Sequence, residues 1–138
     1  FADDERSFWL DSSRLDSGKA QFSFMGGSCG PLAYQLQYNV QTRGMDIFRR
    51  GQPVEHVPCC DVLSFVKEQL ALASADNPEL PFDFCGGFVG YLGYELKELC
   101  QDGEGTRNKH VSPHPDSCLL FADRFVAWDH ERSQCFVV

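Results

Sequence analysis

Alternating polar and apolar residues form the clearest pattern in this 138-residue chain. From residue 34 to residue 41 every second side chain is apolar, namely Tyr34, Leu36, Tyr38 and Val40. Successive side chains of a β-strand point to opposite faces of a sheet, so this period predicts a strand with one buried and one wet face. Such half-buried strands favour an antiparallel sheet.

Shorter apolar runs, each bounded by turn-forming residues, predict the other strands. They cover residues 7–11, 21–25 and 45–49, the glycine-rich run near 86–92, and residues 118–128 and 135–138. Because apolar residues continue through 118–128, this segment is expected to form one strand that makes a hairpin with 135–138. The chain ends within this last strand, and we expect that further polypeptide follows it.

Residues 61–73 show the spacing of an amphipathic helix, with apolar side chains recurring every three or four positions. Asp61 is placed to cap the first turn of this helix. Good helix formers between residues 94 and 100 predict a second, short helix. Several strands and one clear helix give an α+β fold, mainly antiparallel sheet, in a single domain over residues 1–138.

A glycine-rich run at 81–97 is the least ordinary stretch of the chain. Four glycines, at positions 86, 87, 90 and 93, stand among five aromatic residues. Glycine inside a strand marks the close approach of another backbone or a ligand, so we expect a buried strand in the middle of the core. The spacing contains neither G-x-G-x-x-G nor a Gly-Lys-Ser/Thr ending, which argues against a dinucleotide loop and a P-loop.

The composition narrows the classes of partner. A net charge of −8 argues against nucleic acid and anionic membranes, since both need clustered Lys and Arg. No apolar run approaches the roughly 18 residues of a membrane-spanning helix. The seven cysteines contain no C-x-x-C pair, so we expect free, mostly buried thiols and a reducing compartment.

No set of side chains predicts a catalytic centre, a cofactor site or a metal site. His110 and His114 stand four residues apart, but Pro113 and Pro115 prevent the regular helix that would bring their imidazoles together. No local signature selects one cysteine as a nucleophile, and free cysteine usually packs as a small apolar residue. We therefore expect no catalytic residue in this chain.

Three sets of segments nevertheless resemble component I of the chorismate-amidating enzymes. They are Phe8–Ser13 with Phe22–Gly27, the element Gly86–Tyr94 of the form GG-x-x-GY-x-GY, and Pro115–Cys118 with Phe121–Arg124 and Asp129–His130. Their order and spacing fit over essentially the whole chain. The residues at Phe82–Cys85 and Phe121–Arg124 are closest to the aminodeoxychorismate synthase family of the plant type, and anthranilate synthase component I is the alternative.

This resemblance implies a non-catalytic N-terminal domain that packs on a catalytic domain. In that family the whole enzyme takes chorismate and glutamine-derived ammonia to 4-amino-4-deoxychorismate, the precursor of p-aminobenzoate and folate. The resemblance assigns chorismate, Mg²⁺ and the reacting groups to a C-terminal domain absent from this chain. That domain and a glutamine amidotransferase domain are the implied partners. A plant-type parent implies a plastid, and any other parent implies the cytoplasm.

The resemblance also implies a tryptophan pocket, which is a feedback site in anthranilate synthases and a structural site in some aminodeoxychorismate synthases. Carried over by position, it points to Leu10, Ser12, Phe22 and Ser23. An indole needs an apolar slot and its amino acid end needs a few polar partners. The family usually has Arg before the aromatic-Ser pair, whereas this chain has Gln21, which carries no charge. The plainer alternative is that Ser12 caps a turn and Phe22 is core.

Two other functions stay open at this point. A regulatory domain of anthranilate synthase component I would require saturable tryptophan binding despite Gln21. A free-standing interaction module unrelated to chorismate chemistry is the third candidate, because a fold does not dictate a function. The first candidate, a domain packed on a missing catalytic domain, predicts exposed apolar area on one face.

Overall fold

The computed structural model describes residues 6–12, 21–58, 61–73, 79–100 and 112–138. These residues form mainly antiparallel strands with few helices, which confirms the α+β prediction. The strands are β1 (Ser7–Leu10), β2 (Phe22–Gly27), β3 (Tyr34–Asn39), β4 (Gly44–Arg49), β5 (Gln52–Val57), β6 (Gly87–Leu92), β7 (Ser117–Ala122), β8 (Phe125–Asp129) and β9 (Gln134–Val137). The helices are α1 (Val62–Leu72), the 3₁₀ turn η2 (Tyr94–Leu96) and α2 (Lys97–Cys100).

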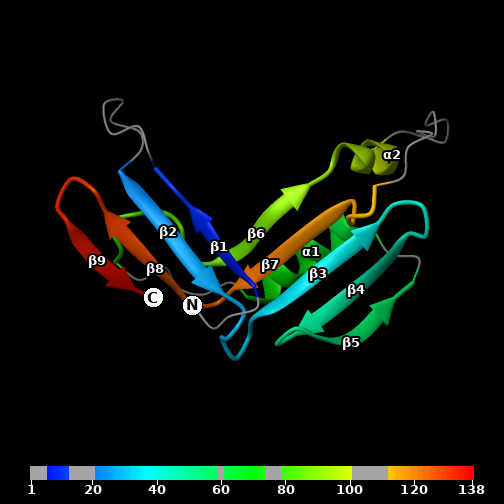
Figure 1. Cartoon of the computed structure of the whole chain (residues 1–138), viewed down its shortest axis with the longest axis horizontal. Coiled ribbons are helices and arrows are strands. Elements are labelled where there is room, and N and C mark those ends of the chain that lie inside the picture. Colours follow the sequence, from blue (N-terminus) through cyan, green and yellow to red (C-terminus); the bar gives the residue numbers. More distant parts are fainter. Residues whose placement is uncertain (1–5, 13–20, 59–60, 74–78, 101–111) are drawn as a thin grey trace.

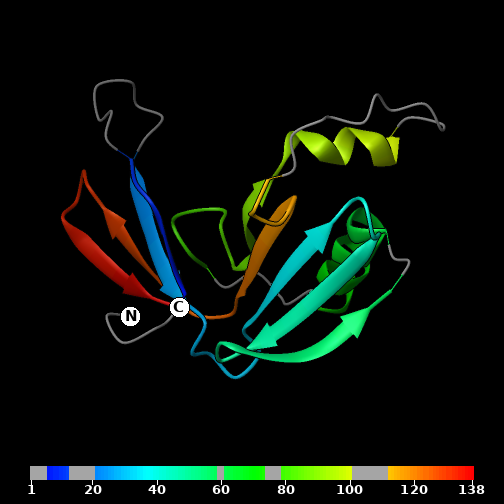
Figure 2. The same ribbon diagram turned by 45° about the vertical axis from the view of Figure 1, so that its right-hand side comes forward.

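The strands build two antiparallel sheets. A four-stranded sheet has the order β1-β2-β8-β9, and a five-stranded sheet has the order β5-β4-β3-β7-β6. The strands of the two sheets run at a large angle to each other, and α1 lies behind the five-stranded sheet (Figure 1). The turned view in Figure 2 keeps α1 behind β3 and β4. Helix α1 therefore covers one face of the five-stranded sheet.

Each sheet has its own hydrophobic core. Behind the five-stranded sheet, Leu36, Tyr38 and Met45 form a buried cluster with Val62 of α1. Behind the four-stranded sheet, a cluster of phenylalanine rings is covered by the irregular segment 80–84. The Phe82 ring of this segment lies edge-on to Phe22 and Phe24, with centroids 5.1 Å and 5.4 Å away. Several such aromatic pairs hold the segment on the sheet.

Both predicted helices are confirmed. The segment expected over 61–73 is α1, and the Asp61 carboxylate caps it by accepting a hydrogen bond from the Leu63 N–H at 3.0 Å. The segment expected near 94–100 is η2 followed directly by α2. Neither of these described helices is long and apolar enough to cross a bilayer.

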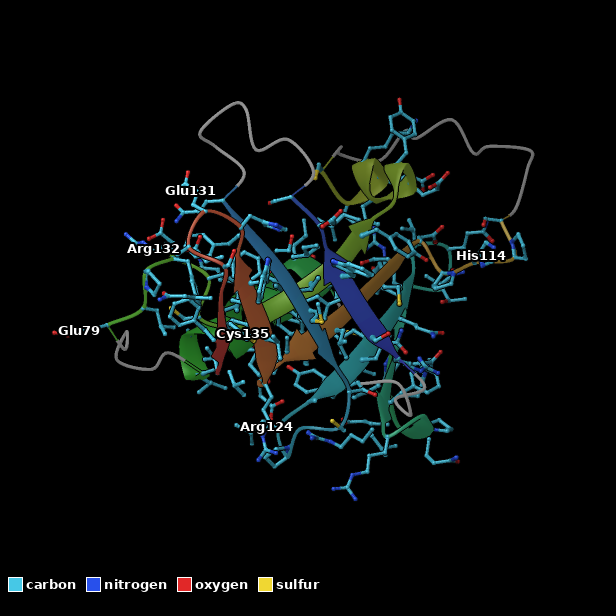
Figure 3. All side chains as sticks on the ribbon, turned by 60° about the vertical axis from the view of Figure 1, so that its left-hand side comes forward. Glu79, His114, Arg124, Glu131, Arg132 and Cys135 are labelled. Carbon is cyan, nitrogen blue, oxygen red and sulfur yellow. The ribbon has the colours of Figure 1, made fainter. Side chains whose placement is uncertain are left out.

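The single strand expected over 118–128 is wrong, because the chain changes sheets there. β7 pairs with β3 and β6, whereas β8 pairs with β2 and β9. The Asp123 carboxylate fixes the crossing by accepting a hydrogen bond from the Leu32 N–H at 2.7 Å. A side chain at Gly30 would collide with that carboxylate, so the loop can close over it. Figure 3 labels Arg124 at this crossing.

The glycine-rich strand is not in the middle of the core. Among the described strands β6 pairs with β7 alone, at the edge of the five-stranded sheet, and its last residues Tyr91 and Leu92 are exposed. The expected close backbone approach is present, however. Gly86 has a φ of +100°, and a Cβ there would lie 2.7 Å from the Ala122 carbonyl oxygen. The glycines allow packing of an edge strand.

Candidate functional site

Ser23 is the centre of the site that the resemblance predicts. It lies on β2, opposite Trp128 of β8, on the face turned away from the phenylalanine cluster. Although it faces that way, only 3% of the residue is exposed. Its Oγ has three partners: the Ser12 N–H at 3.0 Å, Asp11 Oδ1 at 3.0 Å and His130 Nε2 at 2.7 Å.

The single hydroxyl proton of Ser23 determines the direction of each bond. An ionised carboxylate only accepts, so Ser23 donates to Asp11. The oxygen then accepts from the Ser12 N–H and from His130, which places a hydrogen on Nε2 of that imidazole. In a catalytic triad the imidazole accepts the serine proton and the carboxylate contacts the imidazole. Here the carboxylate contacts the serine, so the arrangement stabilises local structure and does not activate a nucleophile.

The four predicted pocket residues do not share one side of the sheet. The Ser12 Oγ donates to the Phe22 carbonyl at 2.6 Å, and the Ser12 N–H reaches Ser23, so these two serines come together. The Phe22 ring points to the opposite face and packs on Phe82. Leu10 is paired opposite Phe24, on the same face as that ring, and is partly exposed. The plainer alternative for Phe22, a core residue, describes its side chain.

Gln21, which stands where the family usually has Arg, has a structural partner. Its side-chain Nε2 donates to Asp129 Oδ2 at 3.0 Å, and its backbone carbonyl accepts from the backbone N–H of His130 at 2.9 Å. The other Asp129 oxygen accepts from the N–H groups of Glu131 and Arg132, in the turn labelled in Figure 3. Burial acts to raise the pKa of Asp129, but these three hydrogen bonds outweigh it and hold the pKa below its ordinary value.

Sequence reasoning missed the three side chains that complete this site, Asp11, Asp129 and His130. His130 lies 107 residues from Ser23, and Asp129 lies 108 residues from Gln21. The resemblance included Asp129 and His130 only as part of a closing strand. No local spacing signal connects residues so far apart, so the hairpin between β8 and β9 could not be assigned to the site from sequence.

A second candidate is a depression of about 370 Å³ at the end of β6. Its lining residues are Tyr91, Gly93, Glu95, Ser112, His114, Pro115 and Asp116. Asp116 has a structural role, because its Oδ2 accepts a hydrogen bond from the Val40 N–H at 2.7 Å. His110 lies outside the described residues, and within the part of the chain that is described no three potential metal ligands gather.

The cysteines are more exposed than expected. Cys100 and Cys135 are exposed free thiols and Cys118 is a half-buried one, whereas Cys59 and Cys60 lie outside the described residues. Cys135 is exposed because it lies opposite Trp128, on the face of the sheet turned away from the phenylalanine cluster. Burial raises the pKa of Cys118, although the Gln35 amide, 2.7 Å from its Sγ, and Arg6 act to lower it. A protonated thiol is a poor nucleophile, so Cys118 gives no catalytic centre.

No family model matches the chain, but several curated proteins do. It is 37% identical over 138 residues to an aminodeoxychorismate synthase of Streptomyces pristinaespiralis, a match that covers 100% of this chain and 18% of that protein. A probable chloroplastic aminodeoxychorismate synthase of Oryza sativa subsp. japonica is 35% identical over 145 residues, covering 97% of this chain and 16% of that protein. Anthranilate synthase component 1 of Streptomyces coelicolor is 32% identical over 127 residues, a match that covers 92% of this chain and 20% of that protein.

Among solved structures, anthranilate synthase component I from Streptococcus pneumoniae TIGR4 has a similar fold. The TM-score is 0.55 at 23% identity, and the match covers 90% of this chain and 25% of that one. The chain therefore spans less than a fifth of the length of the two aminodeoxychorismate synthases.

Proposed function

Because this chain belongs to the superfamily that contains aminodeoxychorismate synthase and anthranilate synthase component I, we propose that it is a non-catalytic N-terminal domain of an aminodeoxychorismate synthase. The match to the Streptomyces pristinaespiralis enzyme over all 138 residues carries this proposal. The identity of 37% to that enzyme, against 32% to the anthranilate synthase component, favours the folate-pathway enzyme.

In this proposal the chain contributes packing and the rest of the enzyme contributes chemistry. The complete enzyme takes chorismate and glutamine-derived ammonia to 4-amino-4-deoxychorismate, with a chorismate-binding domain and a glutamine amidotransferase domain as partners. The rice relative is named as chloroplastic, and we place a plant-type parent in the plastid and any other parent in the cytoplasm. We assign the Mg²⁺ to the catalytic domain, as the family resemblance implies.

The proposal includes an L-tryptophan site at Leu10, Ser12, Phe22 and Ser23, with no charge supplied by Gln21. Because Leu10 and the Phe22 ring lie on the opposite face of the sheet from Ser23, one bound molecule contacts all four only if this end of the sheet rearranges. The hydrogen-bond capacity of Ser23 is already used, so an amino acid end would have to replace His130 or Asp11 as its partner. Isothermal titration with L-tryptophan, and with L-phenylalanine as control, tests this part. Saturable binding of tryptophan but not of phenylalanine supports the pocket. A titration in which tryptophan releases no more heat than phenylalanine contradicts it.

A domain exchange tests the main proposal. In the Streptomyces pristinaespiralis enzyme the matched segment is replaced by this chain, and formation of 4-amino-4-deoxychorismate from chorismate and glutamine is measured. The matched segment of the rice enzyme, inserted at the same junctions, serves as the control. We expect the two chimeras to have comparable turnover. A folded but inactive chimera beside an active rice control would contradict the proposal.

The alternative of an anthranilate synthase regulatory domain predicts a different result. The same exchange into the Streptomyces coelicolor component would then give an enzyme whose anthranilate formation is inhibited by tryptophan. An active chimera in the first enzyme that tryptophan does not inhibit would support the aminodeoxychorismate synthase assignment.

A further inference from the structure

β6 forms an open edge of the five-stranded sheet (Figure 1). The Gly93 N–H donates to the Asp116 carbonyl at 2.7 Å, and in an antiparallel ladder the residues that bond to the neighbouring strand alternate with those that do not. In this alternation Tyr91 bonds to β7, whereas the N–H and C=O groups of Gly90 and Leu92 point away from it. No described residue forms a hydrogen bond with those outward groups.

β6 lacks the features that keep an edge strand from pairing. Natural edge strands carry charges, proline or bulges that prevent the addition of another strand. The opposite edge of the same sheet, β5, contains Pro53 and Glu55 and pairs through a register shift. β6 has neither a charge nor a proline, and its Tyr91 and Leu92 are 45% and 56% exposed. The edge of β6 is therefore suited to accept a further strand.

The depression of about 370 Å³ lies beside this open edge, because Tyr91 belongs to both. Two carboxylates, those of Glu95 and Asp116, are among its lining groups. His114, which Figure 3 labels, is another lining residue. Among the described residues no Lys or Arg forms an ion pair with either carboxylate. The depression therefore has acidic groups without a basic partner.

Together the edge and the depression specify the chemistry of an added strand. Side chains directly opposite each other on neighbouring strands lie on the same face of a sheet, so the residue opposite Tyr91 points toward the depression. Carboxylates favour a basic side chain there, and a cation also binds to the face of a tyrosine ring. Leu92 points to the other face and favours an apolar neighbour. The net charge of −8 further favours a basic partner.

We propose that the open edge of β6 binds an extended segment of another protein as an added strand, with an Arg or Lys side chain of that segment in the depression. Backbone hydrogen bonds to Gly90 and Leu92 supply affinity, and the basic residue opposite Tyr91 supplies specificity. A second copy of this chain fits less well, because its own β6 has no basic residue. The inference does not rest on the proposed function, since it needs only the edge strand and the depression.

Peptide titration followed by two-dimensional NMR tests this inference on the 138-residue chain. The probe is the capped pentapeptide acetyl-Thr-Val-Arg-Val-Thr-amide, and the control peptide has Glu in place of Arg. We expect saturable shifts around β6 with the Arg peptide, at a Kd of about 0.1–1 mM. The Glu peptide should bind at least about tenfold more weakly, because its charge repels the two carboxylates.

Amide hydrogen exchange identifies the strand pairing itself. At about 90% saturation with the Arg peptide, the outward amides of Gly90 and Leu92 should exchange about fivefold more slowly or better, because each forms a new hydrogen bond. The Tyr91 amide already bonds to β7 and should keep its exchange rate. A peptide that binds only through its charge does not produce this alternation.

Matched substitutions test the depression. Glu95→Gln removes the charge with little change of shape, and it should weaken binding of the Arg peptide by about fivefold. Glu98→Gln is the control, since Glu98 lies on α2 and outside the lining of the depression. This control substitution should leave the Kd unchanged.

Three results would overturn the inference: equal binding of the two peptides, binding without slower exchange at Gly90 and Leu92, and no binding at peptide concentrations up to about 5 mM. Slow exchange of those two amides in the peptide-free chain, together with dimerisation, would assign the edge to a second copy and overturn it as well. All of these results are independent of the activities of the chimeras, so failure here leaves the proposed function standing.

Discussion

Ser23→Ala is the sharpest test of the site, because it removes one hydroxyl that joins β2 to residues 11–12 and to His130. The substitution leaves the Ser12 N–H, the Asp11 carboxylate and the His130 imidazole without their shared partner. A neutral hydrogen bond contributes about 1 kcal/mol, and a bond to a charged group contributes about 1.5–3 kcal/mol when it is shielded from water. Asp11 is exposed and regains water, so we expect a total loss of about 2 kcal/mol.

Urea unfolding, followed by circular dichroism, measures this loss directly. For a domain of this size the thermal midpoint should also fall, by about 3 °C for each kcal/mol. Ser7→Ala is the matched control, since Ser7 is an exposed residue at the start of β1, and it should change the stability by less than about 0.5 kcal/mol.

A double-mutant cycle with His130→Ala separates the hydrogen bond from general loss of packing. If Ser23 and His130 act through one bond, the two substitutions together should cost about 1 kcal/mol less than the sum of the single losses. Full additivity, with a Ser23→Ala loss no larger than that of Ser7→Ala, would refute the hydrogen-bond arrangement on which the site rests.

Three other substitutions test the fold around the site. The pKa of Asp129 is lowered in the folded chain, so its carboxylate stabilises the fold at pH values above the ordinary pKa of 3.8. That stabilisation is lost as the pH falls through the pKa of the folded state. In urea titrations the difference in stability between the wild type and Asp129→Asn should therefore be largest near neutral pH and should shrink in acid. Phe82→Ala should lower the free energy of unfolding by about 3–5 kcal/mol, and a loss under about 1 kcal/mol would contradict the role of Phe82 as the centre of the ring cluster. Gly86→Ala should cost about 1–3 kcal/mol in the same assay, because Gly86 has a φ of +100° and a Cβ would press on the Ala122 carbonyl; equal stability would contradict that geometry.

Local sequence patterns predicted the elements that have one buried face and one exposed face. β3 has alternating buried and half-buried residues, so its period of two is visible in the sequence, and α1 has both its cap and its spacing. β5 was missed because it is an edge strand with mostly exposed side chains and contains Pro53. No alternation could mark it.

The change of sheet at Asp123 was hidden for the opposite reason. Nearly every residue of β7 is buried, so its apolar run does not show which residues share a face of the sheet. In the sequence the run therefore continues into β8 without a visible break. The break is set by the bond between the Asp123 carboxylate and the Leu32 N–H, two residues 91 positions apart. The site has the same character: the resemblance found Ser12 and Ser23, but only the folded chain brings His130 to them.

The GG-x-x-GY-x-GY element shows why a specific motif was assigned to the wrong environment. Two of its glycines, Gly86 and Gly90, lie against backbone atoms of β7. Tyr94, by contrast, is 76% exposed. The Tyr91 hydroxyl donates to the Pro115 carbonyl at 2.9 Å, so even the aromatic ring nearer the sheet is fixed at its rim. Sequence patterns equate aromatic residues with core, and Phe88 of this edge strand does pack on Tyr34 and Phe121, whereas Tyr91 is exposed and the glycines make the close backbone contacts. Exposed aromatic residues stand on both sheets, with Tyr91 of β6 45% exposed and Trp9 of β1 69% exposed.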